Sequence, residues 1–465
     1  MSEPFWQTLA TRGDALALVD CDSDTRWTYR ELHDRVRNVA ARLGARRKSL
    51  LLLFPESDAE SIVFYLGALT AGHAVFLSPL GIQQAGARAL IEKYRPEILV
   101  WRSGSPDALT RQEYQLDREA GGYQAWTRCS CEDPPPHEAL ALVLSTSASS
   151  GSPKSARLSR AGLAASAAQV SEALCIEAGD RALLALPFSY VYGLSVLNSA
   201  LHAGCSLVVK RGSLADQQYW SRIAAAQPTT IAAVSHMLEY LRRLEIDSAR
   251  LPTLRKLTHS GDALDPALFT WAFERFGRRG VDLYLMYGQT EACGRMTVLP
   301  PQYLPEMRRS VGRVVRGGEL SVDPDGQVIY RGPGVMLGYA HGREELSLGD
   351  CLHGILHTGD VGSLDERGFL HLTGRASRYS KVFGRRVSLD DIEAYARGYG
   401  LAAVVEKEGV VTVFFELTSP VTPLSRLQLA RQFRLPPQCF QVRTLPALPH
   451  TQRGKVAYGE LVSLA

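Results

Sequence analysis

A run of small hydroxyl side chains followed by a glycine and a lysine offers the first possible chemistry in the sequence. It spans 145–154 and reads STSASSGSPK. The apolar segment 139–144 precedes it, which predicts a strand that enters a loop of small residues. Small side chains let backbone N–H groups approach an anion, and hydroxyls and a lysine add donors. The stretch has the chemistry of a phosphate-holding loop but lacks the Walker spacing, and a solvated Ser-rich turn is the alternative.

Further motifs follow this loop in a definite order. Residues 183–194 read LLALPFSYVYGL, residues 287–291 read YGQTE, residues 357–360 read HTGD and residues 448–455 read LPHTQRGK. In this order the set resembles the adenylate-forming superfamily, which comprises acyl-CoA synthetases, aryl acid ligases and peptide-synthetase adenylation domains. The resemblance covers nearly the whole chain, and the YGQTE and LPHTQRGK segments match the superfamily's patterns fully.

The resemblance implies a nucleotide site that binds ATP. Tyr287 would stack on adenine, Asp360 would accept hydrogen bonds from the ribose hydroxyls, and Arg375 would reach ribose or phosphate. The nucleotide-binding residues implied are Thr146, Ser147, Ser149, Ser150, Gly151, Lys154, Tyr287, Asp360 and Arg375.

The same resemblance implies three catalytic residues. Thr290 would contact the α-phosphate, Glu291 would hold Mg²⁺, and Lys455 would meet the substrate carboxylate and the α-phosphate. A single carboxylate suits Mg²⁺, which takes few protein ligands and shares phosphate oxygens. For Lys455, a surface lysine near a tail is the alternative.

A substrate pocket is implied around the aromatic segment 183–194 and the turns after two later strands. Its expected members are Tyr190, Tyr192, Gly193, His236, His259 and Gly261. A core tyrosine is the alternative for Tyr190, and a structural histidine is the alternative for His236. Val191 and its neighbours offer no carboxylate, so an α-amino acid substrate is disfavoured because its buried ammonium would lack a partner. The tyrosines and histidines favour a flat aryl acid, such as a hydroxybenzoate-like acid, and a fatty acid is the main rival.

Length and pattern predict an α/β protein of two domains. A chain of 465 residues is too long for one ordinary core. Strands alternate with helices over 49–101, which predicts a parallel sheet, whereas 103–136 predicts an irregular connection. We expect a large N-terminal domain of mixed α/β subdomains with a β-rich section, residues 1–376, and a small mobile α+β C-terminal domain, residues 377–465. The resemblance places the hinge at Ser377 and a loop for the thioester step at Gly384.

Composition limits the partners and the cellular compartment that we expect for this protein. The net charge of +4 comes without runs of Lys and Arg interleaved with aromatics, so nucleic acid is not an expected partner. The eight cysteines lack metal-ligand spacing and predict reduced thiols in a cytoplasmic protein. The longest apolar stretch, 62–77, is too short and too interrupted to span a membrane.

These observations predict an AMP-forming ligase of acids with thiols. A carboxylic acid would react with ATP and Mg²⁺ to give an acyl-adenylate. A phosphopantetheine thiol of CoA, or of a separate acidic acyl carrier protein, would then accept the acyl group. Two other classes stay open. One is an enzyme that stops at the adenylate or transfers it to an amine or hydroxyl. The other is a non-catalytic sensor, which the departures at Ala148, Ser155, Ser377 and Tyr458 keep in view.

Overall fold

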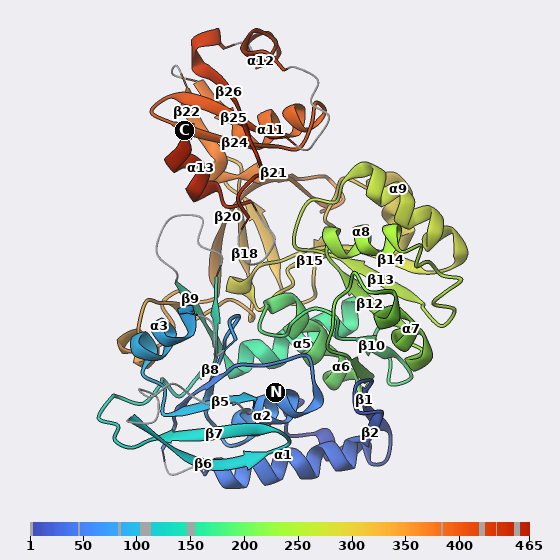
Figure 1. The fold of residues 1–465 in the computed structure, drawn as a ribbon, viewed down its shortest axis with the longest axis vertical. Helices are drawn as coiled ribbons and strands as arrows, with labels where there is room; N and C mark the ends of the chain where they lie inside the picture. The colour runs from blue at the N-terminus through green and yellow to red at the C-terminus, as the bar shows by residue number, and fades with distance from the viewer. Residues whose placement is uncertain are drawn as a thin grey trace.

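The computed structural model describes most of the chain and confirms the predicted α/β class. The described residues are 3–44, 47–81, 85–102, 113–146, 154–382, 385–417, 424–433, 435–450 and 456–465. The helices within them are α1 (Tyr29–Leu43), α2 (Ala59–Thr70), α3 (Ala85–Tyr94), α5 (Arg160–Ala173), α6 (Val191–Ala203), α7 (Gln217–Ala226), α8 (Ser235–Arg243), α9 (Pro266–Arg275), α10 (Leu304–Met307), α11 (Leu389–Arg397), α12 (Arg426–Phe433) and α13 (Tyr458–Leu464). Figure 1 shows their arrangement along the chain.

The larger of two extended sheets has a parallel centre with antiparallel edges. Its order is β16-β15-β14-β13-β12-β10-β11-β1-β2, and β2, β15 and β16 are the antiparallel strands. Parallel strands direct their carboxyl ends to one edge, where ligand sites of α/β sheets form. The strands are β1 (Leu16–Asp20), β2 (Thr25–Thr28), β10 (Arg181–Leu183), β11 (Ser206–Val209), β12 (Thr230–Ala233), β13 (Lys256–His259), β14 (Asp282–Tyr287), β15 (Thr297–Leu299) and β16 (Arg313–Val314).

The second extended sheet carries the predicted phosphate loop between two of its strands. Its order is β19-β9-β8-β4-β3-β5-β7-β6, and β8 runs parallel to β4 and antiparallel to β9. The loop of small residues connects β8 to β9. The strands are β3 (Leu50–Leu53), β4 (Ala74–Leu77), β5 (Ile98–Arg102), β6 (Tyr114–Ala120), β7 (Tyr123–Arg128), β8 (Leu140–Ser145), β9 (Ser155–Ser159) and β19 (Gly338–Ala340).

The prediction of an irregular connection over 103–136 is wrong for part of that segment. Strands β6 and β7 form an antiparallel hairpin in which Ala120 pairs with Tyr123. The two residues of the turn, Gly121 and Gly122, have φ of 59° and 76°. A two-residue hairpin turn needs positive φ at both positions, which glycine adopts without strain. The polar β6 lies at the sheet edge, and this polarity concealed the strand.

Helices α5 and α6 lie between the two extended sheets (Figure 1). One buried cluster joins apolar side chains of α2, α5 and α6 to residues of both sheets. Helix α2 is buried on nearly every side, as a helix that is apolar all round must be. The hydroxyl of Tyr65 on α2 donates a hydrogen bond to Asn198 Oδ1 on α6 over 3.2 Å. This packing holds α6, and the predicted substrate residues lie at the start of that helix.

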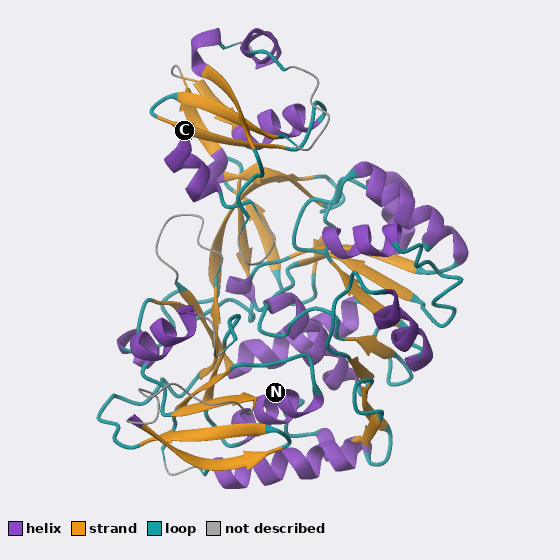
Figure 2. Cartoon of the chain, in the orientation of Figure 1, coloured by secondary structure: helices purple, strands orange, loops and turns teal. Residues whose placement is uncertain are grey.

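A four-stranded antiparallel sheet leads to the C-terminal part of the chain. It contains β17 (Glu319–Val322), β18 (Gln327–Arg331), β20 (Ile355–Leu364) and β21 (Leu370–Arg375). After the short helical turn Ala376–Arg378, the chain enters the orange and red part at the top of Figure 1. Figure 2 shows this part as strands with a few short helices. The strands are β22 (Tyr379–Val382), β23 (Arg385–Ser388), β24 (Ala402–Lys407), β25 (Val410–Glu416) and β26 (Phe440–Leu445). The domain boundary at 376 and 377 stays a prediction.

A buried ion pair ties the segment after β19 to the second sheet. The Arg343 guanidinium donates to both carboxylate oxygens of Glu97, over 3.0 and 2.5 Å. We expect Arg343→Met to lower the free energy of unfolding by about 3–5 kcal/mol, because Glu97 would stay buried without its partner. Urea unfolding followed by tryptophan fluorescence measures the loss.

The matched control for this ion pair is Arg88→Ala, which breaks the exposed pair of Arg88 with Glu92 on α3. It should cost less than about 0.5 kcal/mol. Equal losses for the two variants would contradict the importance given to the buried pair.

Candidate active site

Tyr287, at the end of β14, anchors one half of the site. Its hydroxyl donates a hydrogen bond of 2.5 Å to Asp360 Oδ2, and Arg375 Nε lies 3.1 Å from Asp360 Oδ1. Burial and the charge of Asp360 raise the pKa of Tyr287 well above its usual range, so the phenol remains a donor. The structure thus brings together three residues that were predicted to bind the nucleotide. Tyr287 and Arg375 orient the carboxylate of Asp360 between them.

Tyr339 links the other half of the site. Its hydroxyl donates to Glu291 Oε1 over 2.9 Å, and Lys154 Nζ lies 3.7 Å from the centre of its ring. Burial and the charge of Glu291 raise the pKa of Tyr339, which keeps this donor protonated as well. A cation over an aromatic face is attracted by the ring quadrupole. The lysine after the phosphate loop and the carboxylate predicted to hold Mg²⁺ therefore meet the same tyrosine.

The base of the phosphate loop is closed by hydrogen bonds from Thr146. Its backbone N–H and its hydroxyl both donate to the carbonyl oxygen of Lys154, each over 3.0 Å. The two ends of the loop are thereby held side by side. Several predicted site residues lie outside the described residues, namely Ser147, Ser149, Ser150, Gly151, Gly384 and Lys455.

The turn after β14 is compact because two backbone segments almost touch. A Cβ atom on Gly288 would lie 1.6 Å from the carbonyl oxygen of Gly294, so only glycine fits this position. Thr290 follows in the short helical turn Thr290–Ala292 and is partly exposed. Gln289 Nε2 donates to the carbonyl of Thr358 over 3.3 Å. This contact joins the YGQTE turn to the HTGD segment.

The predicted substrate residues of segment 183–194 lie at the beginning of α6. Tyr190 is the partly exposed residue before the helix, and Tyr192 is buried in its first turn. The Tyr192 hydroxyl lies 3.0 Å from the carbonyl of Thr258 and 2.9 Å from its hydroxyl, at the end of β13. A Cβ on Gly193 would come within 2.5 Å of two carbonyl oxygens, those of Leu186 and Pro187. Gly193 therefore allows α6 to begin close to the loop that precedes it.

The two predicted histidines have different surroundings. His259 is buried, and its Nε2 lies 3.1 Å from Ser235 Oγ and 3.2 Å from Asp262 Oδ1. Ser235 and Asp262 approach the same ring nitrogen of His259. In a catalytic triad, the serine and the aspartate contact different nitrogens of the histidine, so these residues do not form a triad. His236 is exposed, with its ring edge against Tyr240, so the structure does not bring it together with Tyr192. Gly261 is exposed in the turn after His259.

A dense cluster of charges surrounds the predicted hinge. Arg378 Nε donates to Asp390 over 2.7 Å, its Nη2 donates to Glu393 over 2.8 Å, and its guanidinium lies 4.2 Å from the ring centre of Tyr458. The Tyr458 hydroxyl in turn lies 2.8 Å from Glu393 Oε1. Tyr458 therefore attaches the final helix α13 to the residue that follows Ser377. Nothing is described of the side chain of Ser377.

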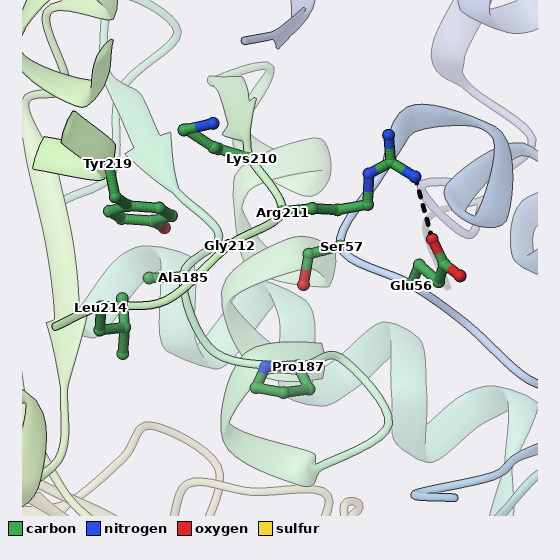
Figure 3. Close-up of a pocket in the computed structure, with 9 residues that line it drawn as sticks. All are labelled: Glu56, Ser57, Ala185, Pro187, Lys210, Arg211, Gly212, Leu214 and Tyr219. Carbon is green, nitrogen blue, oxygen red and sulfur yellow. Dashed lines mark hydrogen bonds and ion pairs between the residues drawn. The ribbon is translucent and has the colours of Figure 1, made fainter. Parts of the chain in front are cut away.

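A separate recess of about 430 Å³ opens where the loops after β3, β10 and β11 meet (Figure 3). Arg211 forms an ion pair of 3.1 Å with Glu56 there, and Lys210 lies 2.9 Å from Asp22. Its cations are thus already paired, and from the motifs described above it takes Ala185 and Pro187 of the segment 183–194. The lining residues are Glu56, Ser57, Ala185, Pro187, Lys210, Arg211, Gly212, Leu214 and Tyr219.

The residues present fit a magnesium ion that shares nucleotide oxygens. Glu291 presents one carboxylate oxygen to Tyr339, and no hydrogen bond engages its Oε2 among the described residues. Within those residues, no three His, Cys, Asp or Glu side chains gather as a metal cage would require. A single carboxylate beside a phosphate loop is the kind of site that Mg²⁺ occupies together with a nucleotide.

Two predictions about the chain as a whole can be compared with the structure. All eight cysteines are free thiols in the structure. In the part of the chain that the structure describes, no helix combines the length and the apolar character needed to cross a membrane.

Comparisons with known proteins identify the family. A family model described as "AMP-binding enzyme" matches residues 5–340. The 2-succinylbenzoate–CoA ligase of Bacillus velezensis is 27% identical, with 96% of this chain and 95% of that protein aligned. The oxalate–CoA ligase of Arabidopsis thaliana is 29% identical over 55% of this chain and 51% of that protein.

The fold agrees over the full length with a solved structure. The o-succinylbenzoate CoA synthetase of Bacillus subtilis, in complex with its acyl-adenylate intermediate, has a TM-score of 0.76 and 22% identity, and 99% of this chain and 98% of that chain are covered. The chain therefore belongs to the AMP-binding enzyme family, the adenylate-forming superfamily that its motifs predicted. The predicted enzyme class, an ATP-dependent and AMP-forming ligase, is confirmed with it.

Removal of the Tyr339 hydroxyl should weaken adenylation. A hydrogen bond to a charged group contributes about 1.5–3 kcal/mol, so Tyr339→Phe should lower kcat/KM for pyrophosphate release about 10- to 100-fold. Tyr339→Leu should lower it further, because the ring contact with Lys154 is lost as well. The matched control is Tyr330→Phe, which removes a buried hydroxyl without a partner in the described residues. Equal activity of Tyr339→Phe and the wild type would contradict the role of this contact.

The raised pKa of Tyr287 should appear in the alkaline stability. An unfolded tyrosine has a pKa of about 10, whereas folded Tyr287 holds its proton to higher pH. The contribution of Tyr287 is fully present below pH 10 and falls by about 1.4 kcal/mol for each pH unit above it. Tyr287→Phe should therefore lose stability less steeply than the wild type between pH 10 and pH 11, as urea unfolding would measure. Parallel curves over this interval would contradict the assignment.

Proposed function

We propose that the protein joins a carboxylic acid to a thiol in two steps at this site. In the first step, a carboxylate oxygen of the acid bonds to the α-phosphorus of ATP, the bond from that phosphorus to the bridging oxygen breaks, and pyrophosphate leaves. In the second step, the thiol sulfur bonds to the acyl carbon and gives up its proton, the bond from that carbon to the adenylate oxygen breaks, and AMP leaves. The products are a thioester, AMP and pyrophosphate.

One observation carries this proposal. The side chain of Tyr339 contacts both the Lys154 ammonium and the Glu291 carboxylate. Lys154 Nζ lies 3.7 Å from the ring centre of Tyr339, and Glu291 Oε1 lies 2.9 Å from its hydroxyl. Lys154 precedes a strand of one extended sheet, and Glu291 follows a strand of the other. The two residues, which are far apart in the sequence, therefore meet at Tyr339. A cation for phosphate oxygens and a carboxylate for their metal ion are the parts that phosphoryl chemistry needs together.

The chain's own residues bind and orient the reactants in this proposal. Tyr287 and Asp360 hold adenosine, and the ends of the loop closed by Thr146 hold the phosphates. Lys154 and Lys455 draw negative charge from the phosphates and the entering carboxylate. Mg²⁺, when bound at Glu291, would withdraw charge from the phosphate oxygens. A complex of the Bacillus subtilis synthetase with ATP and magnesium supports both cofactors.

An aryl acid is the proposed substrate and CoA the proposed acceptor. Similar proteins are named for ligation of 2-succinylbenzoate, an aromatic acid, and all of the named relatives transfer to CoA. This favours CoA over a separate acyl carrier protein. It also favours an aryl acid over a fatty acid, in agreement with the aromatic side chains of Tyr190 and Tyr192.

The C-terminal part, residues 377–465, is proposed to turn between the two steps. Lys455 would serve adenylation, and rotation about Ser377 would replace it by the loop that contains Gly384. The buried contacts of Arg378 with Asp390 and Glu393 support a rigid lever directly after the hinge. The start of α13 is tied to the same cluster through Tyr458. The segment before α13, with Lys455, would then move together with residue 378.

The testing experiment measures pyrophosphate release with ATP, Mg²⁺ and a panel of benzoates, cinnamates, fatty acids and amino acids. We expect release with one class of acid and a loss of about 100- to 1,000-fold in Lys455→Ala. Lys407→Ala is the matched control, because Lys407 is an exposed lysine of the C-terminal part that contacts the backbone of Ala465. It should retain wild-type activity.

The second step is tested by addition of CoA to the acid that reacts, with thioester formation followed by mass spectrometry. Pyrophosphate release without a thioester would favour transfer to another acceptor. ATP binding without pyrophosphate release for any acid would overturn the proposal and favour a nucleotide sensor.

A further inference from the structure

Arg295 is a buried cation that none of the motifs explains. It follows the YGQTE turn, only 3% of its surface is exposed, and its Cζ lies 3.8 Å from the ring centre of Tyr192. Burial lowers the pKa of Arg295 to about 10, so the side chain still carries its charge at neutral pH. A buried charge without a counter-ion is costly, and a stacked phenol ring compensates only part of that cost.

The hydrogen bonds of Arg295 are incomplete. Nη1 donates to the carbonyl of Gly294 over 2.9 Å, whereas Nε and Nη2 have no partner within the described residues. Adjacent Nε and Nη2 donors form the fork that matches the two oxygens of a carboxylate. The free edge of this guanidinium is thus the edge that recognises an anion in the bidentate manner.

Two other deeply buried arginines, Arg157 and Arg343, bond to acceptors of the chain, although Nε of Arg343 has no partner within the described residues. All three nitrogens of Arg157 donate to carbonyl oxygens, among them those of Tyr339 and Leu337. Arg343 holds both oxygens of Glu97. Arg295 differs from them because two of its nitrogens lack partners and no carboxylate among the described residues pairs with it. The chain supplies acceptors for Arg157 and Arg343, whereas two donors of Arg295 are left for an acceptor that the described residues do not supply.

The position of Arg295 joins the two halves of the site. The next residue, Met296, donates its backbone N–H to the carbonyl of Tyr287, on the adenine side. Tyr192, under the guanidinium, bonds to Thr258 at the end of β13, on the predicted acid side. The unpaired donors therefore lie between elements assigned to the nucleotide and elements assigned to the acid.

We propose that Arg295 pairs with a second carboxylate of the acid substrate, so that the protein activates one end of a dicarboxylic acid while Arg295 holds the other. This inference rests on the proposed function and specifies its substrate class. A fatty acid would leave the guanidinium unpaired in an enclosed site. A dicarboxylic acid completes its hydrogen bonds where water is excluded and the pairing is strongest.

The test compares matched pairs of acids in the full-length protein. Benzene-1,2-dicarboxylate is compared with 2-methylbenzoate, and succinate with butyrate, by kcat/KM for pyrophosphate release. We expect the wild type to prefer a dicarboxylic acid, and Arg295→Gln to reduce the ratio of dicarboxylic to monocarboxylic activity about 100-fold or more. Arg295→Lys should restore part of the ratio, because it keeps the charge but loses the planar fork.

The matched control is Arg181→Gln. Arg181 also has a buried nitrogen without a partner, but it lies at the opposite end of the parallel strands, where β10 begins. The ratio of activities should remain at the wild-type value in this variant. A ratio that is the same in wild type and Arg295→Gln, with pyrophosphate release intact, would overturn the inference and leave the proposed function standing.

Thermal unfolding supplies a readout that does not depend on turnover. A dicarboxylic acid should raise the melting temperature of the wild type, its monocarboxylic partner should not, and Arg295→Gln should lose the response. Without acid, Arg295→Gln should melt at the wild-type temperature or above it, since an uncompensated charge is removed. If no acid yields pyrophosphate, the proposed function fails, yet the melting shifts still decide the inference. Absence of any shift with dicarboxylic acids would overturn it.

Discussion

The contact between the Tyr339 hydroxyl and the Glu291 carboxylate determines how the two halves of the site meet. Tyr339 belongs to β19, an edge strand of the sheet that carries the phosphate loop, and Glu291 follows β14 of the other extended sheet. The backbone N–H of Met336 also donates to the carbonyl of Glu291 over 2.8 Å, so side chain and backbone fix the same register. The predicted phosphate loop and the predicted adenine side are thereby positioned against each other by two bonds across the sheets.

This register depends on a buried arginine behind it. Arg157 on β9 donates to backbone carbonyls of β19 and of the loop around Gly349. These side-chain bonds add to the backbone ladder that already pairs β19 with β9. β19 therefore stays attached to β9, and Tyr339 remains within reach of both Lys154 and Glu291. The chemistry of the site is supported by a side chain that no motif contains.

Sequence reasoning was most informative where a motif fixes both residue type and spacing. Tyr287, Asp360 and Arg375 were predicted from three short segments, and the structure brings them together through a hydrogen bond and an ion pair, while their roles toward a nucleotide stay predictions. It was least informative where the signal is a single side chain or a polar edge. The exposed His236 was indistinguishable from a ligand by type, and the β6–β7 hairpin was concealed by polar residues despite its two glycines. Tyr339 belongs to none of the motifs described in the sequence analysis, and its role depends on a partner 48 residues away.

The sequence alone could not single out Arg295. What distinguishes this residue is that two of its buried nitrogens lack partners, and only the packed structure reveals this. Arginine is common on surfaces, and its position four residues after Glu291 suggests a solvated turn. Folding instead encloses it against Tyr192, between Gly294 and the end of β14. A buried charge lowers the stability of the free protein unless a ligand completes it. The fold meets this demand internally for Arg157, Arg343 and Arg378, through carbonyls or carboxylates supplied by the chain. For Arg295 the missing acceptor has to come from outside the described residues, and the acid substrate is the anion that enters the site beside it.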